Sequence, residues 1–417
     1  MTALKKEVFI RNRQNLMNKL GDNCAVVLFS GEQIKRSADE AYDFVTNRNF
    51  FYMTGIDGEE NIALFITKVN GKVQETLFIK AINLEYEKWY GETIRPDAAK
   101  EKSGIENVAF MPSFKGALHN AITKMEITDF YFDLERDSFN AKKSVSEEFA
   151  QKITATYPQV SIKDVYNKIA LLRMVKCEDE VAEIQKAIDI TIKGVEKVMK
   201  NARPEMVEHE MEAYFDFVMK SNGVKELAFT TIAAGGKNAA TLHYSTNNCT
   251  VKDGEMLQLD LGAAVGHYCG DISRAFPVNG KFTKRQSEVY EAVLRVNKKC
   301  IEAIKPGVSY LEWNAAATDM IAEECINLGL IKKKSGVRNY YWHSIGHSLG
   351  LDCHDVGTRD FKFEPGMVLT VEPGIYIAEE GIGVRIEDDV LVTKNGHEVL
   401  TKEMMKEADE IEAFMVE

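Results

Sequence analysis

The chain has 417 residues, of which 45% are hydrophobic and 28% are charged. This is the composition of a soluble globular protein, and the length suits two domains. The formal net charge of −12 argues against a nucleic-acid partner, because a nucleic-acid binder needs a basic face. Seven cysteines without Cys-x-x-Cys spacing, no apolar leader and no run of about 18 apolar residues predict a cytoplasmic protein that lacks disulfides and membrane contact.

The first part of the chain mixes short apolar runs with amphipathic segments. Residues 24–31 (CAVVLFSG) form an apolar run that ends in glycine, which predicts a buried strand. Residues 61–80 hold two apolar runs around Asn70-Gly71, a pattern typical of a β-hairpin. Further elements are expected as a strand at 127–134 and helices at 5–20, 113–125 and 144–156. The pattern predicts a compact α/β domain over residues 1–165.

The second part of the chain, residues 171–417, alternates long helices with strand pairs. A long helix is expected over residues 169–200, because apolar side chains recur on one face of it. Residues 254–276 predict two strands joined by a turn at residues 266–268. The remaining expected elements are helices at 204–221, 285–304 and 310–328, and strands at 367–371, 375–378 and 384–393. The domain boundary is expected near residues 164–171.

Acidic residues within apolar strands are the main anomaly of the sequence. Asp260, Glu372 and Glu387 each interrupt a strongly apolar run, and Asp271 follows Asp260 by eleven residues, on the next expected strand. A buried carboxylate without a partner is costly, and several in one place repel each other. Divalent metal ions would relieve both effects, and the number of acids suggests two ions. For Asp260 or Glu387 taken singly, a strand-end acid paired with lysine is the alternative.

Three of the eight histidines, His343, His347 and His354, lie within twelve positions. Imidazole together with carboxylates suits Mn, Fe, Co or Zn. One histidine with four carboxylates is a hard set of donors, which favours Mn(II) and leaves Co, Zn or Fe as alternatives. An isolated histidine is more often structural, and this applies to His119, His209, His267 and His397.

These residues, in their order and local contexts, resemble the metal ligands of the pita-bread metallopeptidases. That family includes methionine aminopeptidase, prolidase and aminopeptidase P. The resemblance implies a dinuclear site whose ligands are Asp260, Asp271, His347, Glu372 and Glu387. It also implies that Asp271 and Glu387 contact or span both ions, and that Glu372 serves in proton transfer as well.

The resemblance extends over nearly the whole chain. Residues 8–20 and 26–57 resemble the creatinase-type N-terminal domain of aminopeptidase P, and residues 368–377 and 383–393 resemble the two glutamate strands of the family. The fold class implied is therefore α/β (α+β), with a creatinase-like α/β domain followed by a pita-bread catalytic domain. The activity implied is that of a bacterial-type Xaa-Pro aminopeptidase, which removes the residue before a penultimate proline by attack of a metal-bridging hydroxide.

The same resemblance implies roles around the metal ions. His243, within Thr-Leu-His-Tyr, and His354 are expected to line the substrate site, with His343 close behind, and His354 is expected to hydrogen-bond the scissile carbonyl. Arg385 lies two positions before Glu387 in an expected strand, so both side chains face the same side and Arg385 is expected to orient a ligand carboxylate. A surface arginine is the alternative.

Two further residues bear on specificity and assembly. Trp89 resembles a family tryptophan that reaches the active site of a neighbouring subunit, so a homodimer or homotetramer is expected; a core tryptophan is the alternative. Prolidase, which cuts only Xaa-Pro dipeptides, is the alternative activity, and Arg359 or Lys362 would then grip the free carboxylate of the dipeptide. A non-catalytic peptide-binding protein and a creatinase-like amidinohydrolase are more remote alternatives, because both lack the complete ligand set.

Overall fold

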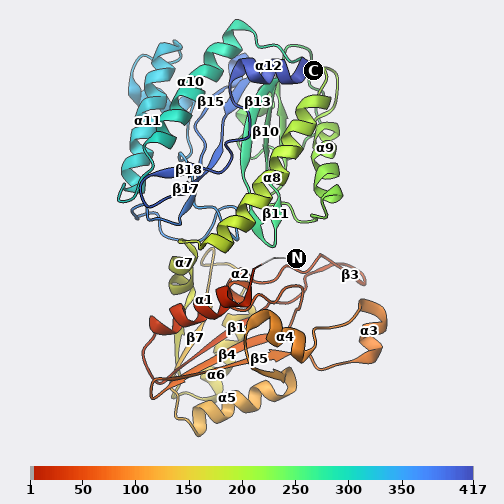
Figure 1. Ribbon diagram of the computed structural model, residues 1–417, viewed down its shortest axis with the longest axis vertical. Helices are drawn as coiled ribbons and strands as arrows, with labels where there is room; N and C mark the ends of the chain where they lie inside the picture. The colour runs from red at the N-terminus through yellow and green to blue at the C-terminus, as the bar shows by residue number, and fades with distance from the viewer. Residues whose placement is uncertain (1–3, 417) are drawn as a thin grey trace. The chain divides into compact units, whose positions relative to one another are not determined.

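The computed structural model describes residues 4–416, which divide into two compact units, Leu4–Arg173 and Met174 onward (Figure 1). The short helix α7 (Tyr166–Arg173), which contains most of the boundary expected from the sequence, lies within the first unit. Among the described residues, no helix combines the length and the apolar character needed to cross a membrane.

A six-stranded sheet with the order β6-β5-β4-β1-β7-β8 forms the centre of the first unit. Its strands are β1 (Cys24–Phe29), β4 (Ala63–Val69), β5 (Lys72–Ile79), β6 (Asn107–Phe110), β7 (Asp129–Phe132) and β8 (Ser161–Asp164). The predicted hairpin β4–β5 is confirmed: Asn70 and Gly71 have φ angles of 50° and 73°, as a tight two-residue hairpin turn requires. The strand β1 is apolar and buried because it lies inside the sheet, between β4 and β7.

Helices cover this sheet and build its core. They are α1 (Lys6–Asn18), α2 (Arg48–Thr54), α4 (Pro96–Ser103), α5 (Phe114–Thr123) and α6 (Val145–Thr156). The short helix α3 (Leu84–Tyr90) buries none of its residues. A short hairpin of β2 (Lys35–Ser37) and β3 (Glu40–Ala41) stands apart from the sheet. Phe114 of α5 packs between Phe78 of the sheet and Phe149 of α6, so both helices bury their apolar faces in one core. The helix α6 begins where the sequence predicts, because Ser144 and Glu147 form a capping box.

The second unit places its strands between two pairs of helices. On one flank lie α8 (Glu178–Asn201) and α9 (Glu208–Ser221), and on the other α10 (Lys284–Glu302) and α11 (Tyr310–Asn327), as Figure 1 shows. A last helix, α12 (Ala408–Val416), packs against α8 and α10. Both α8 and α10 have one apolar face that is buried against the strands, as their sequence pattern predicts.

The strands of the second unit form small antiparallel sheets. One sheet has the order β13-β10-β9, a second β14-β17-β18, and two hairpins are β11–β12 and β15–β16. The bounds are β9 (Ile232–Gly235), β10 (Met256–Leu261), β11 (Ala264–Val265), β12 (Tyr268–Cys269), β13 (Ile272–Pro277), β14 (Val368–Val371), β15 (Gly374–Ile377), β16 (Ile382–Arg385), β17 (Asp388–Val392) and β18 (His397–Val399). The expected strand pair at 254–276 is confirmed, and the turn residue His267 has a φ of 71°.

Two expected helices begin later than predicted. The long helix expected from residue 169 is wrong as one element, because the chain breaks between α7 and α8. There the backbone N–H of Lys176 donates to the carbonyl oxygen of Gly366, and Glu180 accepts from the N–H of Cys177 to start α8. The helix α9 begins at Glu208 rather than at residue 204, because Glu205 and Val207 pair in strand-like fashion with residues 250–251.

The single strand expected at 384–393 is also wrong, and the difference shapes the site. The chain pairs with β15 up to Arg385, then leaves that partner and pairs with β14 from Asp388 onward. Between the two strands, the N–H of Glu387 donates to the carbonyl oxygen of Ser273 at 3.1 Å. Glu387 therefore lies at a junction where the chain passes from one sheet to another.

Candidate metal centre

The five predicted ligands come from separate elements of the second unit. Asp260 lies in β10, Asp271 directly before β13, His347 in the loop before β14, Glu372 directly after β14, and Glu387 between β16 and β17. In the β10–β13 register Asp260 is opposite Ser273, two positions beyond Asp271. Because side chains alternate along a strand, both acids lie on the same face of this pair, as the spacing of eleven residues predicted.

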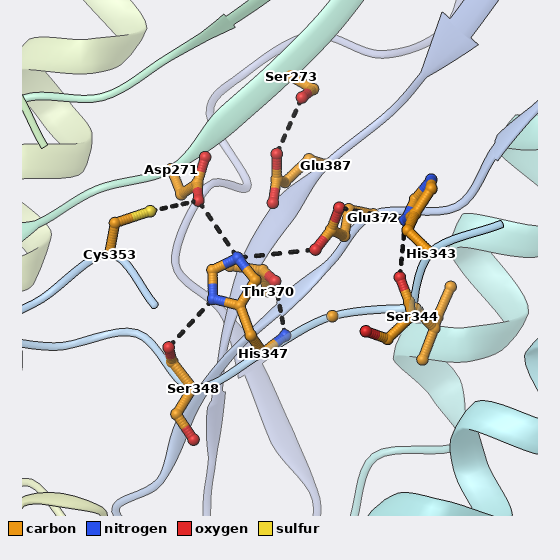
Figure 2. A network of polar contacts seen from close by, with 12 residues as sticks. Asp271, Ser273, His343, Ser344, His347, Ser348, Cys353, Thr370, Glu372 and Glu387 are labelled. Atoms are coloured by element: carbon orange, nitrogen blue, oxygen red, sulfur yellow. Dashed lines mark hydrogen bonds and ion pairs between the residues drawn. The ribbon is translucent and has the colours of Figure 1, made fainter. Parts of the chain in front are cut away.

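Three of these residues form a close group of possible ligands. One donor atom from each of Asp271, His347 and Glu387 lies within 4.8 Å of the others. The Nε2 atom of His347 is 3.5 Å from Oδ2 of Asp271 and 3.6 Å from Oε1 of Glu372, as Figure 2 shows. Its Nδ1 lies 3.1 Å from the carbonyl oxygen of Ser348, which can only accept. The ring proton is therefore on Nδ1, and the lone pair of Nε2 faces the carboxylates.

The loop that carries this histidine lies very close to β14. A Cβ atom at Gly346 would be 2.0 Å from the carbonyl oxygen of Thr370, so only glycine fits at that position. Thr370 also accepts the N–H of His347 through its hydroxyl at 3.0 Å. These contacts explain why the histidine segment is rich in glycine, and they fix the histidine backbone against the strand that leads to Glu372.

The electrostatics of the group show an excess of negative charge. Burial, followed by the charge of Asp260, raises the pKa of Glu387 to about 8. Burial and the charge of Glu387 raise the pKa values of Asp271 and Glu372 well above the usual range of carboxyl groups. The protein thus gathers carboxylates in a buried place without enough positive charge of its own to balance them.

Arg385 connects Asp260, the remaining predicted ligand, with Glu387. Its Nη2 donates to Oδ2 of Asp260 at 2.5 Å, and its Nε donates to Oγ of Ser273 at 2.8 Å. The Ser273 hydroxyl in turn donates to Oε2 of Glu387 at 2.9 Å. Only 4% of Arg385 is exposed, so the alternative of a surface arginine is wrong. One guanidinium therefore holds Asp260 directly and Glu387 through Ser273.

Unpartnered oxygens test whether metal ions fit this site. The Oδ1 atoms of Asp260 and Asp271 are buried and have no hydrogen-bond partner, although buried polar atoms are normally satisfied. A cation that contacted both oxygens would satisfy them and reduce the repulsion among the acids. Carboxylate oxygens together with one imidazole nitrogen are donors that divalent transition ions accept. The residues present therefore fit divalent metal ions.

Three further histidines surround this group. His343 contacts the Tyr376 hydroxyl through Nε2 at 2.8 Å, and its Nδ1 lies 3.5 Å from Oε2 of Glu372. The ring centroid of His354 is 4.2 Å from that of His347, and His354 is exposed. Burial is the main cause that lowers the pKa values of His343, to about 3, and of His354, and the charge of His243 contributes to both shifts. His243, His343 and His354 therefore lie close enough to influence one another's charge.

Trp89 and Arg359 are not among the residues gathered here. Trp89 lies in α3 of the first unit and is 82% exposed, so the alternative of a core tryptophan is wrong. Arg359 is exposed on the loop before β14, and so are its neighbours from residue 357 to 360. Neither residue contributes a hydrogen bond to the group within the described part of the chain.

Sequence reasoning missed three residues that support the ligands. Cys353 donates its thiol hydrogen to Oδ2 of Asp271 at 3.0 Å, and Ser273 donates to Glu387 (Figure 2). Ser273 also accepts from Arg385 and so bridges the two residues. The Tyr376 hydroxyl lies between His343 and Arg385. Cys353 could have been suspected from its place between two histidines, and Ser273 from its place opposite Asp260. Tyr376 gives no signal in the sequence, because its role depends on the β15–β16 hairpin.

Comparison with known proteins agrees with this geometry. The profile of metallopeptidase family M24 matches residues 182–394, and that of the aminopeptidase P N-terminal domain matches residues 9–130. The Xaa-Pro aminopeptidase of Escherichia coli K12 is 32% identical and covers 100% of this chain and 99% of its own length. The chain belongs to the aminopeptidase P family of M24 metallopeptidases. Its fold is accordingly a creatinase-like α/β domain followed by a pita-bread domain.

Other members of the aminopeptidase P family extend the comparison. Human Xaa-Pro aminopeptidase 3 is 32% identical, with 94% of this chain and 81% of its own length covered. A solved Bacillus anthracis protein, described as a candidate aminopeptidase P, is 43% identical with a TM-score of 0.98, and 99% of each chain is covered. Escherichia coli aminopeptidase P, solved with the inhibitor Pro-Leu, is 32% identical with a TM-score of 0.90 over 99% of this chain and 98% of its own. A zinc-substituted form of that enzyme was solved with product.

Proposed function

We propose that the metal centre performs the Xaa-Pro aminopeptidase reaction that membership of the family assigns to this chain: removal of the N-terminal residue from peptides whose second residue is proline. The observation that carries the proposal is the convergence of Asp271, His347 and Glu387, with donor atoms within 4.8 Å of one another in a setting short of positive charge. Glu372 and Asp260 complete a set of ligands that is intact at every expected position.

The site is proposed to hold two divalent ions, with Mn(II) as the preferred metal. Four carboxylates with one imidazole are hard donors, which suits Mn(II) better than softer ions. When bound, the ions would activate a water molecule as nucleophile and polarise the scissile carbonyl. The Oδ1 atoms of Asp260 and Asp271 are free to meet them, and the Nε2 lone pair of His347 already points toward the carboxylates.

The remaining side chains bind and orient. Arg385 fixes Asp260 and, through Ser273, Glu387, so that the ligand oxygens keep their positions while the substrate changes. His243 and His354 line the substrate side as exposed imidazoles, and the lowered pKa of His354 keeps that ring neutral near pH 7, able to donate a hydrogen bond to the carbonyl. Uncharged donors of this kind can stabilise the negative charge that develops on the carbonyl oxygen.

Glu372 is the proposed proton carrier between the nucleophilic water and the departing proline nitrogen. Its Oε1 is 3.6 Å from His347 and its Oε2 is 3.5 Å from His343. Burial raises its pKa, which brings the group closer to the pH at which a side chain can both take up and release a proton. His343, held by Tyr376, would keep the carboxylate directed toward the site.

Assembly and peptide length form the last part of the proposal. Trp89 is 82% exposed in a short helix with the exposed Leu84 and Tyr90, and such a patch suits a contact between subunits. A homodimer or homotetramer in which Trp89 faces the substrate site of a neighbour is therefore proposed. Sedimentation of the wild type and of Trp89→Ala tests this; a monomeric wild type would contradict it.

The test of the activity is a comparison of Xaa-Pro dipeptides with Xaa-Pro-Xaa tripeptides and longer peptides, assayed with Mn(II). Turnover of the longer peptides with release of only the first residue is expected. Turnover confined to dipeptides would instead identify a prolidase. Arg359→Ala separates the same alternatives, because it would weaken dipeptide cleavage selectively only if Arg359 grips a terminal carboxylate.

A further inference from the structure

A buried carboxylate outside the metal centre is held by an unusual set of partners. Glu208 is the first residue of α9 and its exposure is 0%. Its Oε1 accepts hydrogen bonds from the N–H of Gly235 at 2.8 Å and from the side-chain amide of Asn238 at 2.9 Å. Its Oε2 accepts from the Tyr244 hydroxyl at 2.7 Å and from the N–H of Cys249 at 2.9 Å. Four donors, none of them a lysine or arginine, thus satisfy the oxygens of a fully buried side chain.

All four donors come from one segment, residues 235–249. Gly235 and Cys249 are its ends, and Asn238 and Tyr244 lie inside it. The N–H of Glu208 also donates to the carbonyl oxygen of Cys249, so the backbone of α9 holds the same end of the segment. A carboxylate that binds both ends and the middle of a segment removes most of its conformational freedom.

His243 lies in the middle of this segment, next to Tyr244. Its ring takes part in none of the hydrogen bonds found among the described residues, and the residue is exposed. Within this part of the chain, no hydrogen bond therefore holds the imidazole ring, and the backbone of His243 sets the position of the ring. That backbone is held through the neighbouring Tyr244, whose hydroxyl donates a hydrogen bond to Glu208.

We infer that Glu208 is a positioning residue for the substrate side of the metal centre: its carboxylate holds residues 235–249 and thereby sets the place of His243. The inference rests on the proposed function, since it assigns Glu208 a part in that reaction. Glu208 does not touch the metal group, so its effect passes through His243 rather than through the ligands.

The substitution Glu208→Gln tests this with almost no change of shape. The amide nitrogen of glutamine can donate but cannot accept, so it would face either Gly235 or Cys249, whose backbone N–H groups also only donate. One buried N–H loses its partner, and the segment loosens. Because displacement by about 1 Å can cost about 100-fold in rate, kcat/KM is expected to fall by about 10- to 100-fold.

A cycle of two substitutions separates positioning from general damage. In the His243→Ala background, Glu208→Gln is expected to cause less than about a twofold further loss, because the group that it positions is already absent. Metal content, measured by mass spectrometry, should stay equal to that of the wild type. Losses that multiply in the double variant, or a loss of metal that matches the loss of activity, would overturn the inference.

A matched control and an independent readout complete the experiment. Glu210 lies half a turn further along α9, is exposed, and among the described residues accepts a hydrogen bond only from the N–H of Val207 at the helix start. Glu210→Gln should leave kcat/KM within about twofold. Hydrogen exchange of residues 236–249 should accelerate in Glu208→Gln and not in Glu210→Gln, and unchanged exchange would also overturn the inference.

Two provisions keep the result decisive. Should Glu208→Gln fail to fold, Tyr244→Phe removes one of the four donors and enters the same cycle, with an expected loss of about 3- to 10-fold. A wild type that cleaves no Xaa-Pro peptide would overturn the proposed function, and with it the role assigned to Glu208. That failure is visible in the wild type alone. It therefore cannot be confused with the other contradictory outcome, in which the losses from Glu208→Gln and His243→Ala multiply in the double variant.

Discussion

Glu387 and Asp388 are neighbours in the chain, and both are buried, yet their carboxylates are held in opposite ways. Asp388 accepts hydrogen bonds from Arg274 at 2.8 Å, Lys406 at 2.7 Å and Thr401 at 2.9 Å. Burial acts to raise the pKa of Asp388, but the two cations outweigh it and lower the pKa to about 2. Glu387 accepts from the Ser273 hydroxyl, and its pKa is raised to about 8.

The two carboxylates differ in how their charge is balanced. The chain supplies enough positive charge for Asp388 but not for Glu387. Around Asp388 the protein supplies both cations, so the cluster contributes to the stability of the fold. Around Glu387 it supplies acids and one arginine, so the cluster destabilises the protein until positive charge arrives from outside. Adjacent positions can therefore serve stability and chemistry separately, and this contrast can be tested.

The largest expected effect is on catalysis, from Glu387→Gln. Because Glu387 is a proposed metal ligand, loss of one of its carboxylate oxygens should lower kcat/KM by at least about 10³-fold, equivalent to about 4 kcal/mol. Above pH 8, where Glu387 is ionised, the metal-free variant should be at least as stable as the metal-free wild type, because one repelling charge is gone. Urea unfolding and steady-state kinetics measure both. Retained activity, or a clear loss of stability in the metal-free variant, would contradict the assignment of Glu387 to a cluster that lacks balancing positive charge.

The next effect is on stability, from Arg274→Met. This change leaves Asp388 buried without its guanidinium partner and should lower the free energy of unfolding by about 3 kcal/mol. Arg295→Met is the matched control, since its pair with Glu324 is half exposed on the arginine side and should contribute less than about 1 kcal/mol. Equal effects of the two substitutions would mean that the Asp388 cluster is not the stabilising one.

Metal binding should stabilise the wild type by a similar but smaller amount. At a free Mn(II) concentration 100 times its Kd, the free energy of unfolding should rise by about 2.7 kcal/mol. Thermal unfolding with and without Mn(II), after removal of metal by a chelator, measures the shift. The Glu387→Gln variant should respond less at the same concentration. Full activity of the verified metal-free protein would contradict the proposed mechanism.

The pH dependence of the metal-free protein is the most gradual effect and reports on both clusters. For Glu387 the folded pKa of about 8 exceeds the ordinary value of 4.5, so its contribution is lost as the pH rises through this range. For Asp388 the folded pKa of about 2 is below 3.8, so its contribution is lost as the pH falls toward 2. Stability should therefore be greatest near pH 4 to 5, and should fall by about 1.4 kcal/mol per pH unit for each extra proton held. Saturating Mn(II) should remove the decline at high pH.

The sequence predicted much of this, because the informative signals are local. Each signal is contained in a short stretch of chain: an acid inside one apolar strand, the spacing of Asp260 and Asp271, or the glycine-rich histidine segment. Many of the strands and most of the helices followed from periodicity and turn residues in the same way. Resemblance to a known family then turned separate fragments into one expected site.

What the sequence did not predict depends on contacts between distant segments. Ser273 meets Glu387 across 114 positions, and Cys353 meets Asp271 across 82. The break after Arg385 arises because the chain changes its pairing partner, which no local pattern reveals. The exposure of Trp89 could not be predicted either, because an aromatic residue in a short helix is compatible with a buried or an exposed position.

The passage of the chain between two sheets at Glu387 also has a consequence for synthesis. Residues that must meet at this junction, Ser273 and Glu387, are separated by 114 positions, so no early part of the chain can build the site alone. During translation from the N-terminus, the acids of β10 and β13 emerge long before their partners do. The nascent chain therefore cannot trap metal ions in a finished centre until the last strands are made, and loading is confined to a nearly complete protein.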